Sequence, residues 1–239
     1  MKNKKFWKFL NDLPDEETVL RLDGPIAEES WFGDEVTPAI FLSELNSHPG
    51  DLTVWINSPG GDVFAASQIY TMLMDHKGKV TVKIDGLAAS AASVIAMAGG
   101  EVLMSPSSMM MIHNPMTLAF GWKDEMEKAL DVLDEVKASI INAYEIKTGL
   151  SRNKISRLMD DETWMNARKA KELGFCDALL FSEKDNPDLG EASVAFAARR
   201  TATAVLNKVY PTVPTPLEQG TSYDELKKRL ELLSHEGGY

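Results

Sequence analysis

The chain has 239 residues, of which 44% are hydrophobic and 26% are charged, so it can bury one substantial core like an ordinary globular protein. A formal net charge of −11 argues against a nucleic-acid partner, because phosphate binding relies on clusters of Lys and Arg. No segment approaches the roughly 18 apolar residues of a membrane span. The single cysteine, Cys176, cannot form an internal disulfide, so we expect a cytoplasmic protein.

The first 17 residues are expected to be a separate N-terminal segment. The run is basic at its start, like a signal peptide, but Lys8 interrupts an apolar stretch that is too short for an export signal. We predict a short amphipathic helix here.

Residues 18–181 are expected to form one domain in which strands and helices alternate. The predicted strands are 19–22, 52–57, 80–84, 101–104, 109–113 and a last strand-like run over 175–180. The predicted helices are 37–47, 63–75, 90–98, 122–148 and 167–173. Helix 63–75 is expected to face the core with Phe64, Ser67, Ile69, Tyr70, Leu73 and Met74. This order predicts the α/β class, with parallel strands joined by right-handed crossovers.

Beyond residue 181 the composition changes, and we expect a C-terminal tail over 182–239. An acidic, turn-rich stretch and a run with three prolines over 210–216 indicate a linker. Residues 221–236 are predicted to form a terminal helix that begins with a capping box.

Ser90 lies at the start of a buried small-residue helix, in the segment GLAASAAS over residues 86–93. A serine here can simply be a helix N-cap. The position also suits a nucleophile, because free N–H groups and the positive end of the helix dipole favour developing negative charge. Ser93 is the second candidate, although a serine one turn into such a helix tends to bond back to a carbonyl.

His113 ends a hydrophobic strand in the segment MMMIHNP over residues 109–115. Strand ends line the ligand crevices of open α/β sheets, so His113 is the expected general base. The other three histidines fall in polar turns or in the tail. The alternative is a core histidine that bonds to a backbone group.

Gly60 and Gly61 follow the predicted strand 52–57 in the segment NSPGG. They could serve only as a turn that needs positive φ. A double glycine also lets a substrate approach backbone N–H groups, so Gly60, Gly61 and Ala91 are the expected oxyanion-hole donors.

Three segments together resemble the signatures of the proteolytic subunit of Clp proteases: NSPGG over 57–61, GLAAS over 86–90 and MIHNP over 111–115. The resemblance covers about residues 19–180, in the family's order. The chain is most similar to phage and prophage Clp-related proteases that act in head maturation, which also carry a tail.

The resemblance implies a crotonase-like ββα spiral with a protruding handle helix, and a serine endopeptidase with Ser90 as nucleophile and His113 as base. It places the acid of the triad two positions before an aromatic residue, here Glu162 before Trp164. The family usually has Asp at this position, and Asp161 could fill the role instead. The alternative is that these acids are solvated turn residues beside a helix start and have no catalytic role.

The resemblance further implies a homo-oligomer of seven-membered rings, stacked as a tetradecamer around a chamber that admits polypeptide substrates. The predicted helix 122–148 would be the handle, and its apolar stripe would pack on another copy: Met126, Leu130, Leu133, Val136, Ile140 and Tyr144. The segment 116–121 could pair with an extended substrate. No ATP-binding P-loop motif is present, so unfolding would need a separate ATPase, and phage capsid proteins are candidate partners. We expect no cofactor and no metal.

Two other functions remain open from the sequence. Crotonase-type hydratases and isomerases of coenzyme A thioesters share the fold and also hold an oxyanion with backbone N–H groups. A ring-forming capsid or scaffold partner with a vestigial triad is the non-enzymatic alternative.

Overall fold

The computed structural model describes residues 5–10, 18–27 and 38–181. The predicted linker and terminal helix of the tail lie outside the described residues, as does the expected N-cap of the first helix, Thr37.

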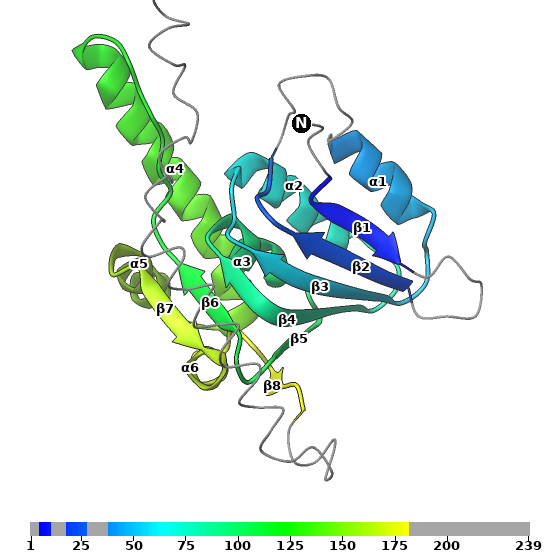
Figure 1. Cartoon of the computed structure of the whole chain (residues 1–239). Coiled ribbons are helices and arrows are strands. Elements are labelled where there is room, and N and C mark those ends of the chain that lie inside the picture. The colour runs from blue at the N-terminus through cyan, green and yellow to red at the C-terminus, as the bar shows by residue number, and fades with distance from the viewer. Residues whose placement is uncertain (1–4, 11–17, 28–37, 182–239) are drawn as a thin grey trace, which may run out of the picture. The chain divides into compact units, whose positions relative to one another are not determined.

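A mixed sheet forms the centre of the described part of the chain (Figure 1). Its strands are β1 (Trp7–Leu10), β2 (Thr18–Asp23), β3 (Leu52–Ser58), β4 (Val80–Ala89), β5 (Glu101–Met104), β6 (Met109–Ile112), β7 (Thr163–Asn166) and β8 (Ala178–Leu179). The main path runs β1-β2-β3-β4-β5-β8, while β6 pairs with β4 and with β7. All pairs are parallel except β1 with β2 and β6 with β7, so the α/β class is confirmed.

Six helices complete the described residues: α1 (Pro38–Asn46), α2 (Val63–Met74), α3 (Ala91–Ala96), α4 (Lys123–Thr148), α5 (Arg152–Asp160) and α6 (Ala167–Glu172). The first three lie side by side on one face of the sheet (Figure 1). As expected for an apolar helix of small residues, all of α3 is buried. None of the helices in the described ranges is long and apolar enough to cross a membrane.

Strand β4 changes partner along its length, and this places the site. Its first half pairs with β5 over Thr81–Ile84, whereas its second half pairs with β6 over Leu87–Ala89. The sequence prediction ended this strand at Ile84, but it continues to Ala89. Because β4 and β6 run parallel, their carboxyl ends lie at the same edge of the sheet.

The N-terminal segment was predicted wrongly as a helix, since residues 7–10 form strand β1 against β2. Side chains in this short run alternate: Trp7 is buried and Lys8 is exposed. The Trp7 indole donates to Glu44 of α1 at 2.8 Å, which fixes the edge strand to a helix. A run of four residues is too short to show whether its apolar side chains repeat at helical or at strand spacing. Pairing with the edge of β2 makes it a strand.

The predicted inner face of α2 was wrong at two positions, because Phe64 is 57% exposed and Met74 is 51% exposed. The helix instead buries Ala65, Ala66, Ile69 and Leu73. Small residues let α2 approach the neighbouring α3 closely.

Helix α4 is buried at one end only. Its C-terminal half buries Ile140, Ile141, Ala143 and Tyr144 before Gly149 ends the helix with a φ of 68°. Its N-terminal half projects away from the sheet (Figure 1), and Leu130 there is 61% exposed.

Candidate active site

Ser90 occupies a strained turn between β4 and α3. Its backbone has φ 54° and ψ −127°, a conformation that residues other than glycine rarely adopt. Its N–H donates to the carbonyl of Met111 in β6 at 2.9 Å. The side chain makes no capping bond to α3, so the N-cap alternative does not explain the hydroxyl.

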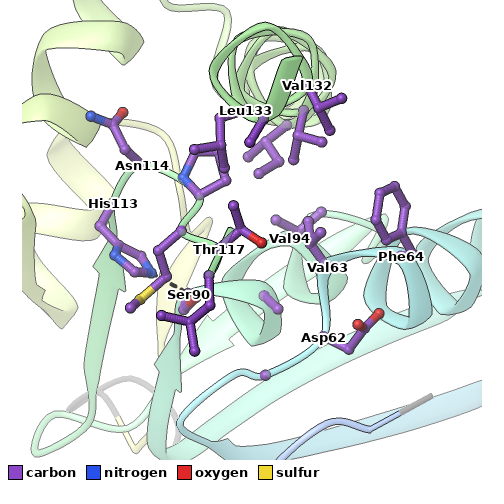
Figure 2. Close-up of a pocket in the computed structure, with 18 of the residues that line it drawn as sticks. Asp62, Val63, Phe64, Ser90, Val94, His113, Asn114, Thr117, Val132 and Leu133 are labelled. Atoms are coloured by element: carbon purple, nitrogen blue, oxygen red, sulfur yellow. Dashed lines mark hydrogen bonds between the residues drawn. The ribbon is translucent and has the colours of Figure 1, made fainter. Parts of the chain in front are cut away.

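The Ser90 hydroxyl instead meets the imidazole of His113. Oγ of Ser90 lies 2.8 Å from Nε2 of His113, and both side chains are half-buried (Figure 2). His113 follows the last residue of β6, so the shared edge of β4 and β6 brings the two groups together. With Nε2 unprotonated, the serine donates its proton to this nitrogen, which is the geometry that activates a hydroxyl nucleophile.

Within the described residues, none of the three consecutive acids, 160 to 162, makes a hydrogen bond or an ion pair with His113. The Glu162 carboxylate accepts from the indole of Trp164 at 3.1 Å. Asp160 accepts from Asn114 at 3.0 Å and from Lys137 of α4 at 2.6 Å. Asp161 caps the end of α5 through its backbone.

The strand register nevertheless favours Glu162 as the neighbour of the imidazole. The antiparallel ladder between β6 and β7 ends with Ile112 opposite Thr163, so His113 and Glu162 are the residues just beyond its last pair. Glu162 has left the strand conformation, with a φ of 44°. Asp160 is already held by two partners.

Asp160 links the histidine strand to α4. The Lys137 ammonium beside it, and then the Asn114 amide, hold the pKa of this carboxyl below its usual value. This contact joins the residue after His113 to the base of the long helix.

The expected oxyanion donors divide into two kinds. The Gly60 N–H donates to Oγ of Ser58 at 3.1 Å, so it would have to give up this bond to act as an oxyanion donor. Its importance is steric, because a Cβ at position 60 would lie 2.6 Å from the carbonyl oxygen of Ala89 and 2.7 Å from Cβ of Ser90. No hydrogen bond from the N–H of Gly61 or Ala91 is found in the part of the chain that the structure describes, so both can face a ligand.

A cleft of about 780 Å³ opens in front of this pair. Figure 2 shows Ser90 and His113 on one side of it, with Phe64 of α2 and Val132 of α4 further along. Apolar side chains supply most of the lining, and the charged groups Asp62, Glu125 and Lys128 also border it. The cleft can therefore accept an extended chain with apolar side chains beside a reactive hydroxyl.

The segment after His113 exposes apolar side chains at every second position. Met116, Leu118, Phe120 and Trp122 are each between 81% and 88% exposed. Part of the segment lines the cleft, and it leads directly into α4.

The second serine candidate, Ser93, does not reach the cleft. It is fully buried, and its hydroxyl donates to the carbonyl of Ser90 at 2.6 Å, as the sequence analysis expected. It also lies 2.7 Å from the hydroxyl of Tyr144. Cys176 is buried as well, and burial raises the pKa of its thiol to about 11, which fits an unreactive cysteine.

The contact between Ser93 and Tyr144 was not predicted from the sequence, because Tyr144 was assigned to an apolar stripe of α4 that packs against another copy. Four members of that stripe instead line the cleft of their own chain: Leu133, Val136, Ile140 and Tyr144. In the described ranges, no group of three or more His, Cys, Asp or Glu residues is arranged to hold a metal ion.

Comparisons with known proteins show the family of the chain. The family model for Clp protease matches residues 2–183. The ATP-dependent Clp protease proteolytic subunit 1 of Chlamydia muridarum is 34% identical over 166 residues, which span 67% of this chain and 85% of the relative. The ATP-dependent Clp protease proteolytic subunit of Bacteroides fragilis is 35% identical over 138 residues, which span 56% and 67% respectively.

Proposed function

The chain belongs to the Clp protease family, and from this premise we propose that it is a serine endopeptidase that uses Ser90 and His113 to cleave polypeptides. The observation that carries the proposal is the distance of 2.8 Å between Oγ of Ser90 and Nε2 of His113 at the head of an apolar cleft. The family match does not favour the hydratase or the scaffold alternative.

In the proposed reaction, Nε2 of His113 takes the proton of Ser90 as Oγ attacks the carbonyl carbon of the scissile peptide. The N–H groups of Gly61 and Ala91 hold the oxyanion that forms. The imidazolium then gives its proton to the leaving amine, and an acyl-enzyme remains on Oγ. Water, deprotonated by His113, attacks this ester and releases the second product with the Ser90 hydroxyl restored.

Glu162 is our candidate for the acid of the triad. Its place just beyond the last pair of the β6–β7 ladder, as His113 is on the other strand, supports this role, although its carboxylate accepts from Trp164. We expect Glu162→Gln to lower kcat/KM at least about 100-fold, because the neutral amide lacks the negative charge with which the carboxylate stabilises the imidazolium. Asp161→Asn is the matched control and should stay within about twofold; the reverse pattern would transfer the role to Asp161.

Assembly of several copies into a ring chamber is part of the same proposal. Exposed apolar side chains along 116–122 and on the projecting half of α4 support a surface that another copy covers. The names of the relatives support a separate ATP-dependent partner that delivers substrates. Rings of seven and a role in phage head maturation remain predictions that rest on the resemblance alone, and a cytoplasmic location remains a prediction from the single cysteine.

Peptide hydrolysis tests the proposal directly. Native protein should cleave fluorogenic peptides that carry an apolar residue before the scissile bond, and Ser90→Ala should lower kcat/KM at least about 1,000-fold. Ser47→Ala is the matched control, because this exposed serine follows α1 and its hydroxyl bonds the carbonyl of Ser43 in the last turn of that helix. Undiminished cleavage by Ser90→Ala would refute the proposed function.

A further inference from the structure

Two buried hydroxyls meet directly behind Ser90. Ser93, in the first turn of α3, is fully buried, and Tyr144, near the base of α4, is 1% exposed. Their oxygens lie 2.7 Å apart, and the Ser93 hydroxyl is also 2.6 Å from the carbonyl oxygen of Ser90. The pair therefore connects α4 to the backbone of the nucleophile.

The direction of these hydrogen bonds follows from the number of protons. A carbonyl can only accept, so Ser93 uses its single proton on the carbonyl of Ser90. Tyr144 must then donate to Oγ of Ser93. Burial raises the pKa of the Tyr144 phenol well above its usual value, so the phenol keeps the proton that this bond requires. Hydrogen bonds in such a chain strengthen one another.

The carbonyl of Ser90 belongs to the same peptide plane as the N–H of Ala91. No cis peptide occurs in the described residues, so these two groups point in opposite directions. The Ser93 N–H also donates to the Ser90 carbonyl, at 2.9 Å. When both donors of Ser93 hold this oxygen towards the core, the Ala91 N–H is directed away from it, as an oxyanion donor requires.

Ser90 needs such a restraint because its φ of 54° is disfavoured for a residue with a Cβ. A disfavoured conformation persists only where surrounding contacts over-determine it. Relaxation of the plane would move the Ala91 N–H and rotate the hydroxyl away from His113.

We propose that Ser93 and Tyr144 are positioning residues that lock the Ser90–Ala91 peptide plane and so preset the oxyanion-binding N–H of Ala91. This inference rests on the proposed function, since it assigns the pair a role in the same reaction. Neither hydroxyl touches the substrate, and both act through Ser90. The oxyanion exists only in the transition state and the tetrahedral intermediate, so the pair should affect kcat and leave KM nearly unchanged.

Single-hydroxyl variants test this prediction by steady-state kinetics on peptides, normalised by active-site titration. Ser93→Ala removes the direct bond to the carbonyl and should lower kcat about tenfold, which corresponds to about one hydrogen bond. Tyr144→Phe keeps the ring and should lower kcat about threefold, because Ser93 can still donate. KM should stay within about twofold in both, and the rate of fluorophosphonate acylation of Ser90 should fall in proportion to kcat.

The double variant tests whether the hydroxyls act in series. Because Tyr144 acts only through Ser93, the double variant should have the same kcat as Ser93→Ala within about twofold. Independent multiplication of the two effects, or a rise in KM in place of a fall in kcat, would overturn the inference. Tyr144→Phe also keeps the test decisive if Ser93→Ala folds poorly, since it leaves the shape of the core unchanged.

Ser108→Ala is the matched control. Ser108 is 1% exposed and its hydroxyl bonds the carbonyl three residues earlier, Ser105, at 2.8 Å, just as Ser93 bonds Ser90. Ser108→Ala should lower thermal stability about as much as Ser93→Ala does, without changing kcat. If Ser93→Ala and Tyr144→Phe keep the kcat of this control, the inference fails while Ser90→Ala can still abolish cleavage. Cleavage that survives in Ser90→Ala would instead refute the proposed function itself.

Discussion

The floor and the wall of the cleft are built in opposite ways. The floor, made of the β4–α3 turn and the base of α4, consists of buried groups such as Ala91, Ser93 and Tyr144. The wall, made of the segment 114–122 and the projecting half of α4, leaves Leu118 85% exposed and Leu130 61% exposed. The floor of the cleft is therefore buried by contacts within one chain, whereas the wall leaves apolar side chains exposed.

This difference separates chemistry from assembly. The floor holds the Ser90 hydroxyl beside the imidazole of His113, and the Ser93 and Tyr144 hydroxyls behind it, by contacts inside one chain. The wall exposes apolar side chains that water disfavours, so its surface suits a partner or a substrate. Substitutions in the floor should therefore alter kcat or the stability of the single chain, and substitutions in the wall should alter binding of a partner or a substrate.

Gly60→Ala should break the floor with the largest effect. The new Cβ would press on Ser90 and on the carbonyl of Ala89, so we expect kcat/KM to fall at least about 100-fold through displacement of the nucleophile. Gly24→Ala is the matched control, because Gly24 has a similar φ of 88° but nothing within 4 Å of the added carbon. The control should lose about 1 kcal/mol of stability and little activity, measured by peptide hydrolysis and thermal melting. Equal activity losses in both variants would contradict the account.

Replacing a large side chain by Ala should destabilise the protein more in the C-terminal half of α4 than in its N-terminal half. Ile141 is 6% exposed, so Ile141→Ala should lower the free energy of unfolding by about 2–4 kcal/mol. Leu130 is 61% exposed, so Leu130→Ala should cost less than about 0.5 kcal/mol. Chemical denaturation at a protein concentration that keeps the chain monomeric measures both. A large loss for Leu130→Ala under that condition would show that the projecting half packs within its own chain.

The link between Lys137 and Asp160 should give the smallest effect, and one that depends on pH. The folded pKa of Asp160 is depressed, so its contribution to stability is present above the unfolded pKa of about 4 and disappears as pH falls through the folded pKa. Lys137→Met should lower stability by less than about 1 kcal/mol at pH 7, since the Asp160 side chain is 50% exposed. The difference between the melting curves of the variant and the native protein should shrink as pH falls below about 4; a difference that does not shrink with pH would refute this origin.

The contact between Ser90 and His113 could be anticipated from the sequence, because each candidate site residue ends a recognisable strand or begins a helix. The strands that precede Gly60, Ser90 and His113 are apolar and bounded by turn residues, and parallel order places their ends at one edge. The long helix was also predictable, since Gly149 marks its end and its apolar stripe repeats at helical spacing.

The remaining features depend on contacts between distant residues. Helix α5 was missed because it buries only Ile155 and Met159, too few for a clear period. The acid stayed ambiguous because three acids follow one another, and which of them lies near His113 depends on how β7 pairs with β6, a contact between distant residues. The bond between Ser93 and Tyr144 joins residues 51 positions apart, a distance that no local pattern encodes.

Reaction with a fluorophosphonate, followed by mass spectrometry of peptides, tests the central claim most directly. We predict a single adduct on Ser90, formed at least about 100-fold more slowly in His113→Ala, because the imidazole no longer removes the proton. An adduct on another residue, or an equal rate of labelling without the imidazole, would contradict the pairing of Ser90 with His113 on which the account depends.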